Sequence, residues 1–184
     1  MKNIVEDLIY IMRSENEDKS NSAITYLGLL VERHIQDRYC DIDYLHLFHN
    51  DIQIYNLKLS ENDVNSILET VLFELFLYVN KNPVSLAWCL GKFHDKDILS
   101  DFLKLFEIYK NDDDVFLQLL FSLNSIYDLR EIMNTLNLEL KKIDLSKLEK
   151  SKEYLIELSS IFQNLKPFYS DTPGGADFQS VPTT

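Results

Sequence analysis

Four residues with side chains that can bind a metal ion recur at every third position, namely Cys40, Asp43, His46 and His49. Thiolate, imidazole and carboxylate groups are the usual ligands of zinc. On one ideal helix, steps of three residues wind around the axis and carry the outer pair apart, whereas a loop could gather all four. The usual Cys and His pair spacings of zinc sites are absent. We therefore predict that the chain binds no metal or cofactor. We interpret the segment that holds these four residues as a polar, partly exposed insertion rather than a metal site.

Cysteine catalysis would need a base beside Cys40 or Cys89, and the sequence does not show whether His34 or His94 lies next to either cysteine in space. Cys89 lies within SLAWCLGKF, where a small thiol suits helix packing. The chain contains no GxSxG, HExxH or glycine-rich phosphate loop. We predict that the protein is not an enzyme.

Two acidic turns are the candidate partner-binding residues. HDKD places two carboxylates in one turn, and NDDD places three at the start of a helix, where the helix dipole favours them. A capped helix start in a solvated loop explains the second turn without any partner. The candidates are Asp95, Asp97, Asp112, Asp113 and Asp114.

The formal net charge of −12 restricts the possible partners. The acidic excess lies before residue 141, because acidic and basic residues balance in 141–184. Such a surface repels nucleic acid and anionic lipid and attracts a basic protein, although acidity can also serve solubility alone. Two cysteines without a CxxC pair favour a reducing compartment. With no expected signal peptide or membrane span, we predict a cytoplasmic protein and leave its oligomeric state open.

Helical periodicity dominates the chain. Apolar stripes predict helices over 3–14 and from Ser20 or Ser22 to Arg38, and a capping box of Ser60 with Asp63 begins a helix that reaches residue 79. That helix is apolar nearly all round, so we expect it to be buried, with Glu61, Asp63, Glu69 and Glu74 forming a solvated acidic face. Residues 39–59 alternate imperfectly and predict an irregular insertion, with a small hairpin as the alternative.

A weak internal repeat organises residues 82–138. LAWCLGKF aligns with LLFSLNSI about 33 residues later, a period typical of stacked helical hairpins. The expected helices are 83–93, capped by Asn82; a second capped by Asp97; 115–126; 129–140; and a long closing helix over 144–165. Trp88 and Phe121 could line a binding groove, but their helical spacing favours core packing.

Residues 85–114 resemble a HEAT-type repeat. The resemblance rests on Ala87, Leu90 and Gly91 at the end of the first helix, on the Asp-bearing turn, and on a Leu-rich second helix followed by an acidic turn. It implies an all-α fold, a short right-handed superhelix of stacked antiparallel hairpins. The expected organisation is one helical domain over 1–166 with a flexible tail over 167–184, which is rich in Gly, Pro, Ser and Thr.

A small acidic helical chain of this kind also looks like the immunity proteins of bacterial toxin systems, some of which are HEAT-like. The resemblance implies a non-catalytic inhibitor that binds a basic protein, possible targets including a toxin domain. The alternatives are a HEAT-like scaffold or adaptor subunit and, third, a metal-binding or enzymatic protein that uses residues 40–49.

Overall fold

The computed structural model describes residues 4–39, 58–78, 80–127, 135–136, 138 and 140–158. Within these ranges all regular structure is helical, so the all-α prediction is confirmed. Most of the predicted insertion over 39–59, most of the predicted helix over 129–140 and the predicted tail over 167–184 lie outside the described residues.

Six α-helices and two 3₁₀ turns have defined bounds, and residues 135–136, 138, 140 and 149–158 are also helical. The elements with defined bounds are α1 (Ile4–Met12), α2 (Glu17–Tyr39), α3 (Glu61–Leu77), α4 (Pro83–Leu90), η3 (Lys96–Ile98), α5 (Leu99–Ile108), α6 (Asp113–Ile126) and η4 (Leu145–Lys147).

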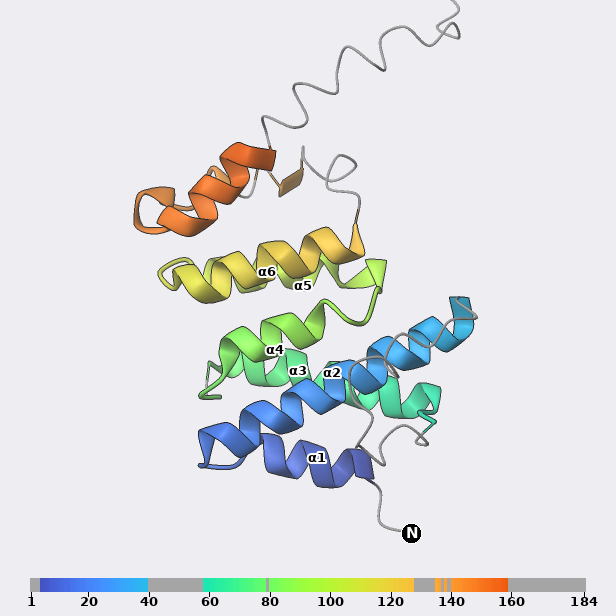
Figure 1. Cartoon of the computed structure of the whole chain (residues 1–184). Helices are drawn as coiled ribbons and strands as arrows, with labels where there is room; N and C mark the ends of the chain where they lie inside the picture. Colours follow the sequence, from blue (N-terminus) through green and yellow to red (C-terminus); the bar gives the residue numbers. More distant parts are fainter. Residues whose placement is uncertain are drawn as a thin grey trace, which may run out of the picture.

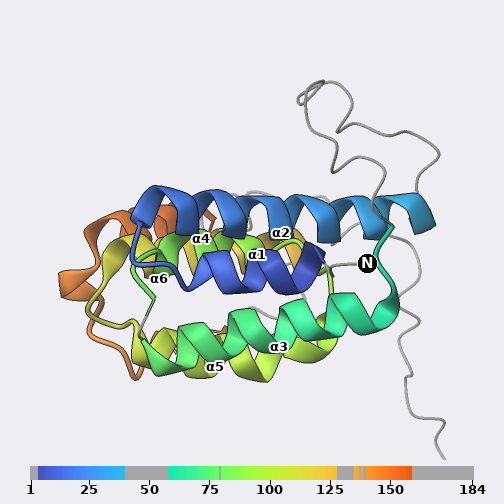
Figure 2. The same ribbon diagram turned by 90° about the horizontal axis from the view of Figure 1, so that it is seen from below.

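The helices pack in two layers (Figures 1 and 2). Helices α2, α4 and α6 lie side by side in one layer, α3 and α5 lie in the other, and α1 lies beside α2 and α3 at the end of the stack. Successive helices pack most closely in the pairs α1 with α2, α3 with α4, and α5 with α6. The predicted pairing of α4 with the helix that follows it is therefore wrong.

Connection length explains this pairing. Residues 78–82 join α3 to α4 and residues 109–112 join α5 to α6, whereas residues 91–98 separate α4 from α5. Short connections force helices into antiparallel neighbours, and the longer one carries the chain to the next pair. The sequence repeat still has a structural counterpart, because its two copies fall on α4 and α6, neighbours in one layer.

Several helix starts were predicted correctly. Ser60 and Asp63 form the capping box of α3, Pro83 is the first residue of α4, and the Asp112 side chain accepts a hydrogen bond from the Val115 N–H at 3.2 Å. Asn82 precedes α4 without a side-chain cap; its amide donates instead to the Glu17 carbonyl.

Three other starts were predicted wrongly. Asp97 does not cap α5, because Asp95 accepts its N–H at 2.8 Å and the chain first makes the turn η3. Helix α2 begins before Ser20, which is buried and donates to the Met12 carbonyl at 2.6 Å. The closing helix begins at residue 149, after η4, because the Asp144 carboxylate holds the Ser146 N–H and hydroxyl in a turn.

Helix α3 differs from its sequence pattern on two faces. Phe73, Leu77 and Tyr78 are each more than half exposed, so the expected burial on all sides is wrong. Glu74, expected in solvent, is only 5% exposed and accepts a hydrogen bond from Arg13 Nε at 2.7 Å. The cation from the end of α1 stabilises a carboxylate that would otherwise be costly to bury.

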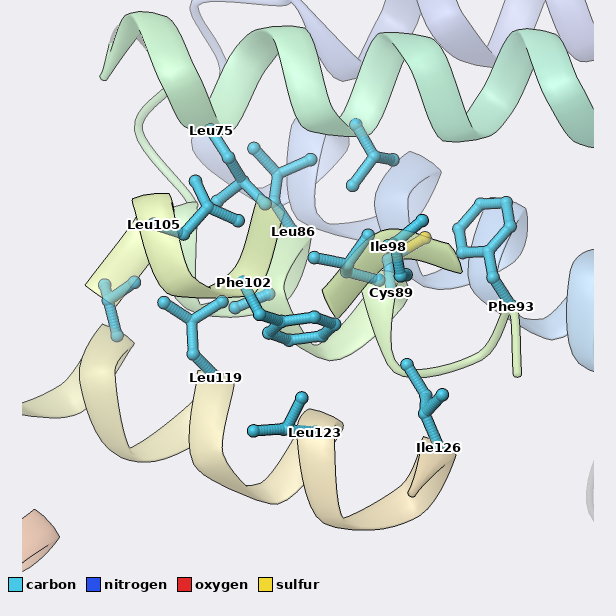
Figure 3. Close-up of a cluster of buried hydrophobic side chains, with 14 of the residues drawn as sticks. Leu75, Leu86, Cys89, Phe93, Ile98, Phe102, Leu105, Leu119, Leu123 and Ile126 are labelled. Carbon is cyan, nitrogen blue, oxygen red and sulfur yellow. The ribbon is translucent and has the colours of Figure 1, made fainter. Parts of the chain in front are cut away.

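One hydrophobic core runs between the layers (Figure 3). Leu75, Phe102, Leu105, Leu119 and Leu123 bring α3, α5 and α6 together there, and each is fully buried. The Tyr109 hydroxyl is also buried and donates to the Leu75 carbonyl at 2.9 Å. That bond gives a second donor to the Leu75 carbonyl, which also accepts the Tyr78 N–H at 3.3 Å at the C-terminal end of α3.

Helix α4 approaches α6 closely because both carry small residues at the contact. A Cβ atom on Gly91 would lie 2.8 Å from Ser122 Oγ and 3.0 Å from Ser122 Cα. The Ser122 hydroxyl donates to the Ala87 carbonyl at 2.7 Å, and the Ser125 hydroxyl donates to the Gly91 carbonyl at 3.0 Å. These bonds place α4 and α6 parallel, since higher numbers on one helix pair with higher numbers on the other.

Replacement of Gly91 by alanine tests this contact. Gly91 has an ordinary helical φ of −65°, so alanine would normally stabilise the chain by reducing the entropy of the unfolded state. The clash with Ser122 reverses the sign, and we expect G91A to lower the free energy of unfolding by about 1–3 kcal/mol in urea titrations. The exposed Ser100→Ala is the control. A G91A protein as stable as wild type would contradict the close approach.

Candidate functional site

The five predicted acidic residues lie in two separate turns. Asp95 and Asp97 precede α5, whereas Asp112, Asp113 and Asp114 follow it. Helix α5 has ten residues, so the two turns are separated by about 15 Å along its axis. The two turns therefore lie at opposite ends of α5, and whether a partner contacts all five carboxylates stays a prediction.

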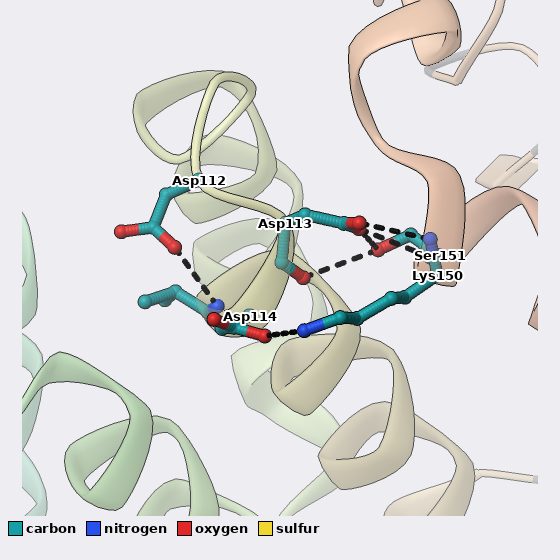
Figure 4. A network of polar contacts seen from close by, with 6 residues as sticks. Asp112, Asp113, Asp114, Lys150 and Ser151 are labelled. Atoms are coloured by element: carbon teal, nitrogen blue, oxygen red, sulfur yellow. Dashed lines mark hydrogen bonds and ion pairs between the residues drawn. The ribbon is translucent and has the colours of Figure 1, made fainter.

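The second acidic turn is engaged within the protein (Figure 4). The Asp113 carboxylate accepts the Lys150 N–H at 2.8 Å, the Ser151 N–H at 3.0 Å and the Ser151 hydroxyl at 2.6 Å. Asp113 of α6 thus caps the start of the helix over 149–158. Partial burial raises the pKa of this carboxyl, but the bonds from Ser151 and Lys150 and the charge of Lys150 outweigh it and leave the pKa below its usual value.

Asp114 is more available than Asp113. It pairs with Lys150 Nζ at 2.6 Å, but the two side chains are 64% and 61% exposed. An exposed ion pair of this kind contributes little to stability, so a cation on another molecule can replace the lysine at low cost.

The first acidic turn faces solvent near Tyr127. Asp97 is exposed, and Asp95 is half-buried and caps η3. The Tyr127 hydroxyl donates to the Lys96 carbonyl, which fixes the turn against the end of α6. The pKa of Tyr127 is raised, mainly by burial and next by the Asp95 carboxylate.

Cys89 is fully buried, and burial raises the pKa of its thiol to about 12. It therefore remains protonated at neutral pH and is unsuited to nucleophilic attack. The candidates Cys40, Asp43, His46 and His49 lie outside the described residues. In the part of the chain that the structure describes, no three His, Cys, Asp or Glu side chains gather as a metal site would require.

A surface groove crosses the layer formed by α2, α4 and α6. The sequence did not indicate it as the leading candidate site. Two adjoining hollows of about 310 and 220 Å³ share Trp88 and Gln118, and we call them together the Trp88 groove. The larger hollow is lined by Asn21, Thr25, Val84, Ser85, Trp88 and Gln118. The smaller is lined by Glu32, Trp88, Gly91, Lys92, His94, Gln118, Phe121, Ser122 and Ser125.

Glycine and one ion pair position the indole of Trp88. A Cβ atom on Gly28 would lie 2.6 Å from Trp88 Cζ3, so the absence of a side chain lets the ring lie against α2. Lys92 Nζ stands 4.7 Å from the ring centroid and 2.8 Å from Glu32 Oε1. The ring is held between a glycine and a paired cation, and it remains half-buried in the groove.

The groove also exposes an aromatic residue on its α6 side. Phe121 is 44% exposed, and its ring contacts that of Tyr154 edge-on, with centroids 4.7 Å apart. Tyr154 comes from the helix over 149–158, which the Asp113 cap holds in place. Trp88 and Phe121 therefore line a groove. From their helical spacing alone, core packing had been the favoured interpretation.

The lining of the Trp88 groove is mainly amide, hydroxyl and aromatic. Three of its residues are ionisable: Glu32 and Lys92 are joined to each other, and His94 is exposed. Aromatic residues in partly buried pockets supply much of the free energy of protein association.

No protein-family model, curated protein or solved structure matches this chain. Among the described residues, no helix is both long and apolar enough to cross a membrane.

The Asp113 cap predicts a pH-dependent stability. Replacing Asp113 with alanine should lower the free energy of unfolding by roughly 0.5–2 kcal/mol at pH 7, as for other lost helix caps. Since the folded pKa lies below the unfolded value of about 3.9, this stabilisation is complete above that value and is lost as pH falls through the folded pKa. Urea titrations from pH 7 to pH 2 measure the gap between wild type and D113A.

The control is Asp97→Ala, which removes the same charge from an exposed side chain. We expect the difference in unfolding free energy between wild type and D113A to be constant between pH 8 and pH 5 and to narrow below about pH 4. If this difference persists unchanged at pH 2, or equals the difference between wild type and D97A at every pH, the carboxylate of Asp113 is not the cap.

Gly28→Ala tests the packing of the Trp88 ring against α2. The added methyl group must displace the indole, so we expect a loss of about 1–3 kcal/mol in unfolding free energy. Trp88 is the single tryptophan of the chain, so its fluorescence should shift to longer wavelength as the ring moves toward water. The exposed Ser66→Ala should leave both quantities unchanged. Unaltered emission and stability in G28A would contradict the described contact.

Proposed function

We propose that the chain is a non-catalytic protein-binding module that binds a basic partner protein. The observation that carries the proposal is the combination of a formal charge of −12 with an aromatic groove across one helix layer. Negative charge speeds the encounter with a basic partner, and the half-buried aromatic groove can supply affinity once the surfaces meet.

The fold proposed to support this role is a short right-handed HEAT-like superhelix. Pairs of helices joined by short connections, with α2, α4 and α6 as neighbours in one layer, support it. In stacked hairpin arrays one layer commonly presents an extended binding surface. The Trp88 groove lies on such a layer.

The specific form that we favour is an acidic inhibitor of the immunity or antitoxin type. It would bind a basic toxin domain and block its activity at equal stoichiometry. A HEAT-like scaffold or adaptor is the second candidate, favoured by the exposed Phe73 and Leu77 on the opposite layer, because a scaffold needs a second contact surface.

Capture of the partner from a lysate of the source cells, followed by binding titration of the purified pair, tests the proposal. We expect a basic partner whose dissociation constant rises roughly tenfold or more between 50 and 500 mM NaCl, because salt screens complementary charge. An acidic partner, or an affinity indifferent to salt, would contradict the proposal. Loss of the partner's own activity on addition of the chain would separate the inhibitor from the scaffold.

A further inference from the structure

The Trp88 groove has a defined direction. Ser85 bonds to Asn21, the Trp88 ring lies over Gly28, and Lys92 bonds to Glu32, so α4 runs parallel to α2. The Ser122 and Ser125 hydroxyls bond to the Ala87 and Gly91 carbonyls and make α6 parallel to α4 as well. The three helices therefore begin at the same end of the groove (Figure 1).

Both outer helices of the groove, α2 and α6, carry a carboxylate at the end where the helices begin. On α2, Asp18 lies three residues before Asn21 and therefore on the same helix face as the groove lining. On α6, Asp114 lies four residues before Gln118 and is likewise on the groove side. Asp18 is exposed, and the exposed Lys150 that pairs with Asp114 is replaceable.

The middle of the groove offers side-chain hydrogen bonding beside an aromatic surface. Among the described residues, the Gln118 amide donates one long bond, of 3.4 Å, to Ser122 Oγ, and the Trp88 indole N–H donates to no acceptor. An extended segment has backbone N–H and C=O groups free to bond with such side chains, whereas a helix satisfies its own.

We infer that the Trp88 groove binds an extended, basic peptide segment of the partner protein. Lysine or arginine side chains of that segment contact Asp18 and Asp114, and an apolar side chain packs against Trp88 and Phe121. The inference rests on the proposed function and adds the surface and the form of the ligand.

The test uses ten-residue peptides selected by display against the full chain. Selected peptides should contain at least two Lys or Arg residues and one aliphatic or aromatic residue. Synthetic copies that lack tryptophan should change the emission of Trp88, the single tryptophan, on titration. Copies with Glu in place of Lys and Arg should bind at least tenfold more weakly. Selection of acidic peptides, or of none, overturns the inference.

Two arginine substitutions localise the binding. Val84 lines the groove and is 39% exposed, so Val84→Arg adds a cation there with little effect on folding; Gln118→Arg is the second variant. Phe73→Arg makes the same change of charge on the other layer, at a 53% exposed side chain. Unfolding titrations confirm that each variant is folded.

We expect V84R and Q118R to weaken the basic peptides at least tenfold and F73R to weaken them less than twofold. Equal effects of all three substitutions, or no effect of the groove variants, overturn the inference. The proposed function is judged separately by the salt dependence of the captured partner, so it survives if that dependence is found while the groove variants still bind normally.

Discussion

Helix α4 can lie between α2 and α6 because glycine stands at both contacts. Gly28 on α2 makes room for the Trp88 ring, and Gly91 at the end of α4 lets the backbone approach Ser122 on α6. A methyl group at either position would meet atoms closer than van der Waals contact allows. Both the packing of this layer and the groove on its surface follow from these two absent side chains.

The close packing of α4 and α6 also fixes the elements beyond them. Helix α6 carries the core residues that meet α5, and its first turn carries Asp113, which caps the helix over 149–158. That helix brings Tyr154 to Phe121 at the edge of the groove. A polar cap at one end of α6 thus positions an aromatic contact along its side, which links local helix chemistry to the shape of the candidate site.

Local features of the sequence predicted local structure well. The apolar periodicity identified α1, α3 and α6, and the capping residues Ser60 and Asp112 mark where two of these helices begin. Features that depend on tertiary neighbours were predicted poorly. Glu74 is buried because Arg13, distant in sequence, lies beside it, and a carboxylate on a helix gives no local sign of such a partner.

In the candidate site too, local features could be predicted from the sequence and tertiary contacts could not. Asp112, Asp113 and Asp114 could be recognised as a helix start, but the bonds of Asp113 to Ser151 join segments that only the fold brings together. Trp88 and Phe121 have a helical spacing that suits a core equally well. Their exposure depends on which layer α4 and α6 occupy and on what covers that layer, and neither is encoded within one helix.

We propose that the partner binds on the layer formed by α2, α4 and α6. Site-specific photocrosslinking in the native lysate tests it most directly, with a photoreactive phenylalanine analogue at Gln118 in one protein and at Phe73 in another. Because Gln118 lies in the Trp88 groove and Phe73 on the opposite layer, we expect a crosslink to one basic protein from position 118 alone. A crosslink to that protein from position 73, with none from position 118, would contradict it.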